Sequence, residues 1–298
     1  MKIIDAHHHF WNVSTGSYPW LEEQAEWLWG NPQDLPREFL PQQLIQGAEA
    51  GGLELVKTVH VQCGYNELQP GDETKFLQGL ADEPGSRGYP HGIVPFADIS
   101  SPDLEEVLSQ HCEYSNTRGV RQLLNRHKNA NWNMADREYL TDSAWRNNFS
   151  LLKKFDLSFD LHLYYHQIDD TISLAHDNSE TLFILNHASV PADRDQESIE
   201  GWRQAINRLA ECENAVAKIS GLGMCDRTWT VDSIRPFVLD MIDAFGAERC
   251  MFASNFPVDS LFSDYQTVWN AYDVITADFS DSDRTGLFHQ NAEKYYRI

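Results

Sequence analysis

Basic residues are scarce in this 298-residue chain: 23 Lys and Arg stand against 45 Asp and Glu, giving a formal net charge of −22. So acidic a protein repels phosphate backbones and anionic lipids, and we therefore exclude nucleic acid and membrane as partners. No apolar run approaches the ~20 residues that a membrane-spanning helix requires. The expected partner is a small-molecule substrate, because a site can be locally basic within an acidic protein.

Closely spaced cysteine pairs are missing as well. The chain has no CxxC motif, and its five cysteines are scattered at Cys63, Cys112, Cys212, Cys225 and Cys250. An odd number at irregular spacing favours reduced thiols over a disulfide framework. We therefore expect a cytoplasmic protein, and the sequence leaves open whether it forms a homo-oligomer.

Short apolar runs alternate regularly with helical patterns along the whole chain. Strands are predicted within 1–11 and at 55–62, 92–98, 118–123, 157–163, 181–185, 215–220 and 249–254. Helices are predicted at 41–50, 73–82, 102–114, 143–155, 168–175, 196–212, 234–245 and 265–298. This pattern predicts an α/β protein, a single-domain (β/α)8 TIM barrel over residues 1–298. An open doubly wound sheet is the second choice, because no strand is followed by a GxGxxG turn.

The first strand ends in three consecutive histidines. Strict alternation would place Asp5, His7 and His9 on one face and His8 on the other. Two imidazoles on one face at a strand end can converge on an ion or a substrate atom. Asp5 could then accept a ring N–H and fix a tautomer. The Trp- and Pro-rich segment 12–40 that follows is too long for an ordinary connection, so we expect a lid or a segment packed over the site entrance.

Polar and aromatic side chains also gather where the other predicted strands end. In a barrel the chemistry lies at the carboxyl ends of the strands. The candidates for substrate binding are Trp11, Gln62, Arg121, Trp132 and His162. We prefer Gln62 over the nearby His60, and we interpret Lys218 as an ion-pair partner inside the barrel. The remaining histidines are expected on the surface or in loops: His8, His91, His111, His127, His176 and His289.

Several segments together resemble the amidohydrolase superfamily, within it the branch of lactone hydrolases that includes 2-pyrone-4,6-dicarboxylate lactonase and sugar-acid lactonases. They are IDAHHHFW at 4–11, GVR at 119–121, FDL at 159–161, NH at 186–187, MFASNFPV at 251–258 and NAEKYY at 291–296. The resemblance implies that His7 and His9 form the family's HxH pair, that His187 is its later histidine, and that one divalent metal such as zinc could bind all three. Asn255 replaces the usual aspartate, so the resemblance also allows a metal-free site. Asp259 could reach in from the following loop.

The resemblance implies a hydrolase that opens the ring ester of a small carboxylated or sugar-acid lactone. The catalytic residues would be His7, His9, His187 and Asn255. Lactone hydrolysis needs a water, a group that takes its proton and positive charge at the carbonyl oxygen. The alternatives are a decarboxylase or hydratase on the same barrel, or a catalytically inactive barrel that binds a small molecule.

Overall fold

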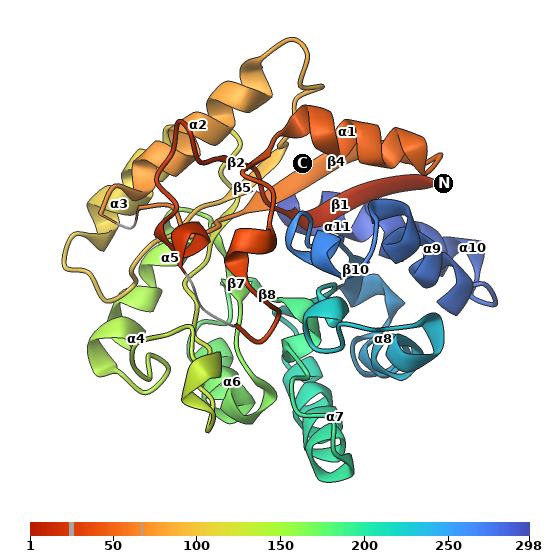
Figure 1. Cartoon of the computed structure of the whole chain (residues 1–298). Coiled ribbons are helices and arrows are strands. Elements are labelled where there is room, and N and C mark those ends of the chain that lie inside the picture. Colours follow the sequence, from red (N-terminus) through yellow and green to blue (C-terminus); the bar gives the residue numbers. More distant parts are fainter. Residues whose placement is uncertain (24–26, 67) are drawn as a thin grey trace.

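The computed structural model describes residues 1–23, 27–66 and 68–298, so parts of the predicted loops 12–40 and 64–71 lie outside it. Eight parallel strands of the described residues form the centre of the molecule (Figure 1). They are β1 Lys2–His8, β4 Glu54–Val61, β5 Gly92–Val94, β6 Gly119–Val120, β7 Ser158–Leu161, β8 Phe183–Leu185, β9 Ala215–Ile219 and β10 Cys250–Phe252.

Backbone pairing continues around the ring of strands. Hydrogen bonds join β1, β4 and β5 in one sheet and β6 to β10 in another. Isolated parallel bridges connect the two sheets at both edges: Ile93 with Thr117 and Phe96 with Arg121 on one side, and His8 with Phe256 on the other. The fold is therefore a TIM barrel, as the alternation of strands and helices predicts.

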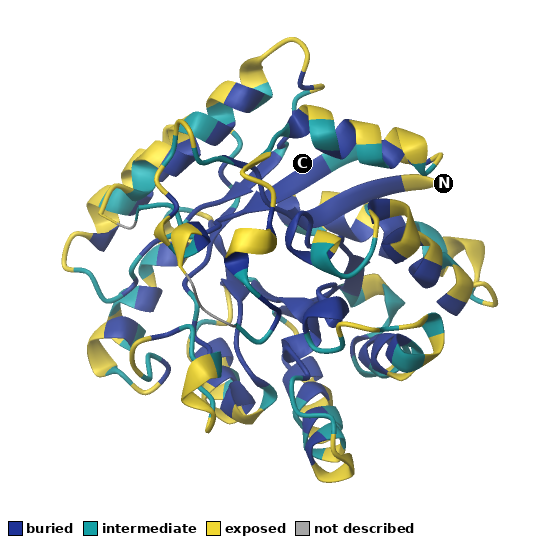
Figure 2. Cartoon of the chain, in the orientation of Figure 1, coloured by how far each residue is buried: buried dark blue, intermediate teal, exposed yellow. Residues whose placement is uncertain are grey.

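Helices surround the strands, and their inner faces are buried against the barrel (Figure 2). They are α1 Pro41–Ala50, α2 Pro70–Asp82, α3 Leu104–Cys112, α4 Ser143–Phe149, α5 Leu151–Lys154, α6 Ile168–Asp177, α7 Gln196–Ala210, α8 Val231–Phe245, α9 Tyr265–Ile275, α10 Asp281–Thr285 and α11 Asn291–Tyr296. Two predicted helices are interrupted: 143–155 divides into α4 and α5, and 265–298 divides into α9, α10 and α11. None of the described helices is long and apolar enough to cross a membrane.

A bulge in β1 changes which side chains share a face. Asp5 pairs with Thr58 and His8 pairs with His60, so three steps along β1 match two along β4. An extra residue of this kind reverses the alternation of side chains. Asp5 therefore lies on the outer side of the strand, where it accepts hydrogen bonds from Ser254 Oγ and, at 3.0 Å, from Tyr265. The prediction that Asp5 would orient a histidine ring on the face of His7 and His9 is wrong for this reason.

The segment after β1 is tied at its base. β2 Trp11–Asn12 pairs antiparallel with β3 Glu38–Phe39, and the described residues between them include short 3-10 turns at Pro19–Glu22 and Pro32–Asp34. In Figure 1 this red segment crosses in front of the strands. A long loop with paired ends is typical of a compact loop that covers a site.

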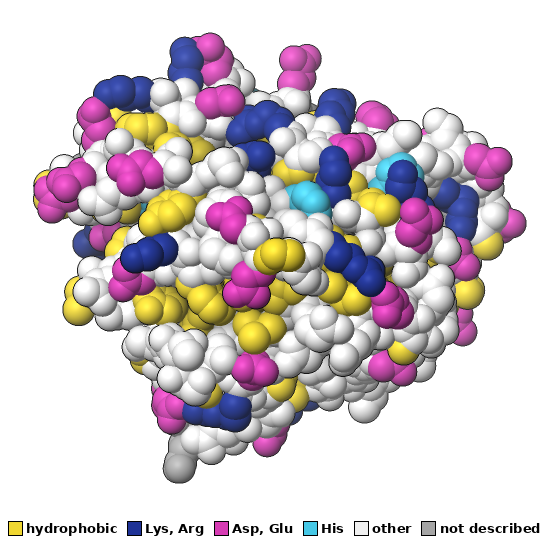
Figure 3. Space-filling model, turned by 90° about the horizontal axis from the view of Figure 1, so that it is seen from above, with side chains coloured by type: hydrophobic (Ala, Val, Ile, Leu, Met, Phe, Trp, Pro, Cys, Tyr) yellow, Lys and Arg dark blue, Asp and Glu magenta, His cyan; other side chains and the backbone are white. Residues whose placement is uncertain are grey.

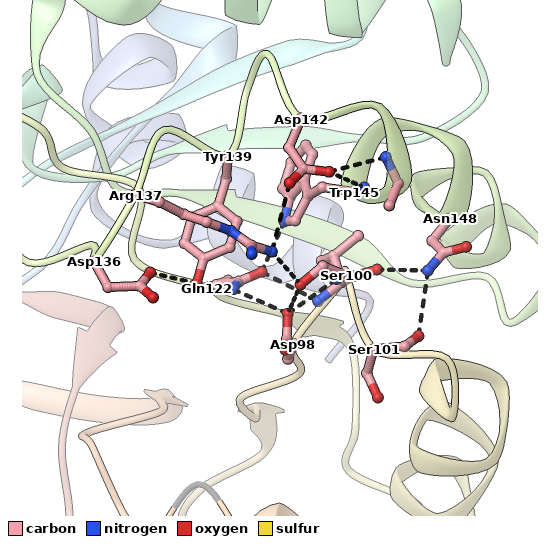
Figure 4. Close-up of polar contacts among 12 residues, drawn as sticks. Asp98, Ser100, Ser101, Gln122, Asp136, Arg137, Tyr139, Asp142, Trp145 and Asn148 are labelled. Atoms are coloured by element: carbon pink, nitrogen blue, oxygen red, sulfur yellow. Dashed lines mark hydrogen bonds and ion pairs between the residues drawn. The ribbon is translucent and has the colours of Figure 1, made fainter.

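A polar network fastens α4 to the loops that follow β5 and β6 (Figure 4). The Gln122 side-chain oxygen accepts from Trp145 Nε1 at 2.8 Å and from the Ile99 backbone at 3.1 Å. Asp142 caps α4 by accepting from the backbone of Ala144 and Trp145. Buried polar groups with satisfied hydrogen bonds favour one packing arrangement, so the network fixes the backbone next to Arg121.

Charged side chains of both signs cover the face seen from above, with hydrophobic side chains between them (Figure 3). Two of the histidines predicted to be on the surface are instead fully buried, His8 and His111. His8 packs against Phe10, with ring centroids 4.2 Å apart. His111 bonds Thr74 Oγ1 and the Phe96 carbonyl oxygen through its two ring nitrogens.

Candidate active site

A cavity of about 500 Å³ opens at the carboxyl ends of the strands. Polar side chains from the strand ends line its inner part, which we call the polar floor: His9, Gln62, Arg121, His162, His187 and Asn255. Large aromatic side chains from the segment after β1 and from the loop after β4 line another part, which we call the aromatic wall: Trp20, Trp27, Trp29 and Tyr65. Two methionines, Met134 and Met224, also face the cavity.

The ends of three strands, β1, β7 and β8, bring four histidines together. The ring centroid of His7 lies 5.0 Å from that of His9 and 4.4 Å from that of His187, and the rings of His162 and His187 are 5.1 Å apart. His7 itself does not line the cavity but lies behind His9 and His187. The chain places His187 with a positive φ of 53°. Such a conformation costs energy in a non-glycine residue and is often found at functional sites.

Hydrogen bonds fix the tautomers of two floor histidines. His9 Nδ1 lies 2.7 Å from the Val61 carbonyl oxygen, which can only accept. In the neutral ring Nδ1 therefore carries the proton, and Nε2 keeps its lone pair. His162 Nδ1 contacts the Asn125 side-chain oxygen at 2.6 Å in the same manner. Both rings can thus accept a proton at the second nitrogen.

Burial keeps these imidazoles neutral. It is the main reason that the pKa values of His7, His9, His162 and His187 lie well below the usual 6.5. The positive charge of Arg121 lowers all four pKa values further. Near neutral pH the floor therefore presents unprotonated imidazoles beside a guanidinium group.

Arg121 is buried in the floor with part of its donor capacity unused. Its Nη2 donates to the Gln62 carbonyl oxygen, and its Nε has no partner among the described residues. Burial lowers its pKa to about 10, so the group stays charged at neutral pH. An unsatisfied buried donor on a cation is well suited to an anion or a polarised carbonyl oxygen.

Lys218 lies within the barrel, where the sequence predicts an ion-pair partner. Its ammonium group is fully buried, pairs with Asp160 and lies 3.1 Å from His7 Nδ1. Asp160 also accepts from the Tyr296 hydroxyl at 2.9 Å. Burial lowers the pKa of Lys218 to about 8.

Asn255 and Asp259 form the last part of the site. Asn255 lines the cavity, and its buried Nδ2 has no partner among the described residues. Asp259 is buried behind it, outside the cavity lining, and its backbone N donates to the Asn255 carbonyl oxygen at 3.1 Å. Burial raises the pKa of Asp259 to about 8.

The structure does not bring the two tryptophans chosen from the sequence to the cavity. Trp11 is fully buried and donates from Nε1 to the Pro36 carbonyl oxygen at 2.8 Å. Trp132 packs its ring against His127 instead. The aromatic wall takes their place. The Trp-rich composition of segment 12–40 is the signal in the sequence that could have identified it.

The donors do not fit a divalent metal well. His7, His9 and His187 do not form a ligand group among the described residues, and the Lys218 ammonium lies against His7. The group of three potential ligands that does lie within 4.8 Å consists of His9, His60 and Cys63. His60 Nδ1 accepts from the Phe10 backbone at 2.9 Å, so the ring proton sits on Nε2, 3.5 Å from a Glu73 oxygen. In this tautomer the Nδ1 lone pair accepts the Phe10 N–H and Nε2 carries the ring proton, so His60 has no free lone pair to hold an ion.

Residues 4–298 match the family model described as Amidohydrolase, and the chain belongs to this family. A relative called uncharacterized protein y4mH, from Sinorhizobium fredii, is 43% identical over 100% of this chain and 99% of its own. An L-fucono-1,5-lactonase from Burkholderia multivorans is 26% identical over 99% and 96% of the two chains. A crystal structure of a Burkholderia multivorans amidohydrolase with bound zinc is similar with a TM-score of 0.82 and 25% identity, covering 100% of both chains.

Proposed function

We propose that this protein is a hydrolase that opens the ring ester of a small carboxylated or sugar-acid lactone. The observation that carries the proposal is the polar floor: neutral histidines with free lone pairs lie beside buried donors that lack partners. The lactonase relatives support the same reaction class.

The reaction requires a nucleophilic water, and His9 is suited to accept its proton. Because the Val61 carbonyl oxygen holds the proton of His9 on Nδ1, Nε2 is the basic atom. As the water oxygen bonds to the carbonyl carbon, its proton passes to Nε2. The ring C–O bond then breaks, and the same proton returns to the leaving oxygen, so the product is a hydroxy acid.

Negative charge that develops on the carbonyl oxygen needs donors in fixed positions. Arg121 Nε and Asn255 Nδ2 are both buried and without partners among the described residues. Such donors stabilise a transition state without reorganisation. In this scheme Asn255 replaces a carboxylate base with a neutral donor. His187 lies on the same floor and is a further hydrogen-bonding group for the substrate.

A divalent ion such as zinc would supply Lewis-acid chemistry at the carbonyl oxygen. The side chains named above provide the corresponding positive charge and base without it. The occupied Nδ1 lone pair of His60 and the ammonium group beside His7 favour this metal-free route.

The test is turnover of a panel of lactones, followed by acid release. We expect His9→Ala to lower kcat/KM by about 100-fold or more, because general base catalysis contributes about that much. The matched control is His176→Ala, since His176 is exposed on α6. Release of carbon dioxide instead of acid would indicate a decarboxylase. Ligand stabilisation without product over the whole panel would indicate a binding protein.

A further inference from the structure

The cavity separates polar from apolar surface. The polar side chains of the floor come from the strand ends, whereas mainly aromatic and aliphatic side chains line the rest, with Glu23 and Asn66 among them. A sugar-acid lactone carries hydroxyl groups around its whole ring, and each buried hydroxyl needs a hydrogen-bonding partner. The aromatic wall offers few such partners.

One polar atom of the wall has a partner within the protein, and another lacks one. Trp20 Nε1 donates to the Cys63 carbonyl oxygen at 2.5 Å. Trp27 Nε1 is buried and has no partner among the described residues, so the wall holds a donor for one acceptor atom. The rings of Trp27 and Trp29 stack on one another, with centroids 6.0 Å apart and planes inclined by 22°.

The mouth of the cavity carries one strongly exposed apolar side chain. Leu68 lines the cavity and is 91% exposed, the most exposed of the large hydrophobic side chains described. A volume of about 500 Å³ falls within the range of ~300–1,000 Å³ that holds drug-sized ligands. The cavity therefore has room for apolar groups beyond a single lactone ring.

We propose that the substrate is an amphipathic lactone, with its ring ester on the polar floor and a hydrocarbon or aromatic substituent against the aromatic wall. An acceptor atom on this substituent would bind Trp27 Nε1, which lacks a partner among the described residues. This inference rests on the proposed function for the ring-opening reaction, but it favours an apolar substituent over the hydroxyl groups of a sugar-acid lactone. The apolar substituent is argued from the wall alone, so the two proposals can fail separately.

The experiment compares γ-lactones that carry ethyl, butyl or hexyl side chains with a polyhydroxylated lactone of the same ring size. We expect kcat/KM to rise about fourfold for each methylene buried, the factor that about 0.8 kcal/mol per methylene gives. Trp27→Ala should reduce this increment. Val274→Ser is the matched control, because Val274 is a half-exposed hydrophobic residue on α9 outside the cavity lining, and it should leave the increment unchanged.

Binding of the corresponding alkyl lactams, followed by tryptophan fluorescence, tests the wall without turnover. Affinity that rises with chain length supports the inference even if no lactone is opened, an outcome that would count against the proposed function only. Faster turnover of the polyhydroxylated lactone, with no gain from the alkyl chain, would overturn the inference while the lactonase proposal stands. Lactam affinity that is independent of chain length would also overturn it.

Discussion

The buried pair of Lys218 and Asp160 should dominate the stability of the barrel interior. Both side chains are fully buried, and the ammonium group has His7 Nδ1 as its other polar neighbour. Lys218→Met leaves the Asp160 carboxylate without its cation, in contact with neutral donors such as the Tyr296 hydroxyl. Breaking a buried pair from one side costs about 3–5 kcal/mol, because an uncompensated charge remains.

Urea unfolding followed by fluorescence gives the free energy of unfolding of each variant. The control is Lys153→Met, since Lys153 pairs with Glu180 on the surface, where both side chains are more than half exposed. Exposed pairs contribute about 0–1 kcal/mol. The double variant Lys218→Met/Asp160→Asn should recover much of the loss because neither charge remains buried. A double variant as unstable as the sum of its single changes would refute the reasoning.

Three further outcomes are expected. Asp259→Asn should gain stability over the wild type as the pH rises. The pKa of the Asp259 carboxyl is about 8 in the folded protein and about 3.8 in the unfolded chain, so between these values the folded state alone keeps the proton. The free energy of unfolding of the wild type therefore falls between pH 4 and pH 8 by on the order of a few kcal/mol. Thermal unfolding at several pH values measures this, and a pH-independent difference contradicts it. Arg121→Lys should lower kcat/KM by about 100-fold, because one fixed donor is lost; an unchanged rate in the lactone assay would remove Arg121 from the chemistry. Treatment with a chelator should leave the lactone rate unchanged, and a loss of rate that zinc restores would contradict the metal-free scheme.

The order of strands and helices could be predicted from the alternation of apolar runs and helical patterns along the sequence. Helix α1 begins at Pro41 and ends at Ala50, the predicted bounds, because a proline begins it and two glycines follow it. The sequence predicts one helix over 265–298, and its division into α9, α10 and α11 could not be predicted. Its interruption by a π-helical turn at Gly286–Gln290 accompanies packing against β1 and β10.

Candidate residues at strand ends are accessible to sequence reasoning because parallel strands place all their carboxyl ends on one rim. The structure places Gln62, Arg121 and His162 there on the cavity. The outward turn of Asp5 could not be predicted, because the bulge depends on the pairing of β1 with β4.

The aromatic wall depends on how a long segment folds back over the barrel. Composition shows that tryptophans gather there, but it does not show which of them point inward. Trp11 and Trp20 are nine residues apart in one aromatic-rich stretch, yet only Trp20 lines the cavity. Tertiary packing decides between them.

The pairing of β2 with β3 has a consequence for how this scaffold can diversify. Both ends of the intervening stretch leave the barrel at one short ladder, Trp11 opposite Phe39 and Asn12 opposite Glu38. That stretch can lengthen, shorten or change its tryptophans without disturbing the strands that carry His9 and Arg121. Substitutions in that stretch can therefore change the lining of the cavity while the polar floor keeps its arrangement.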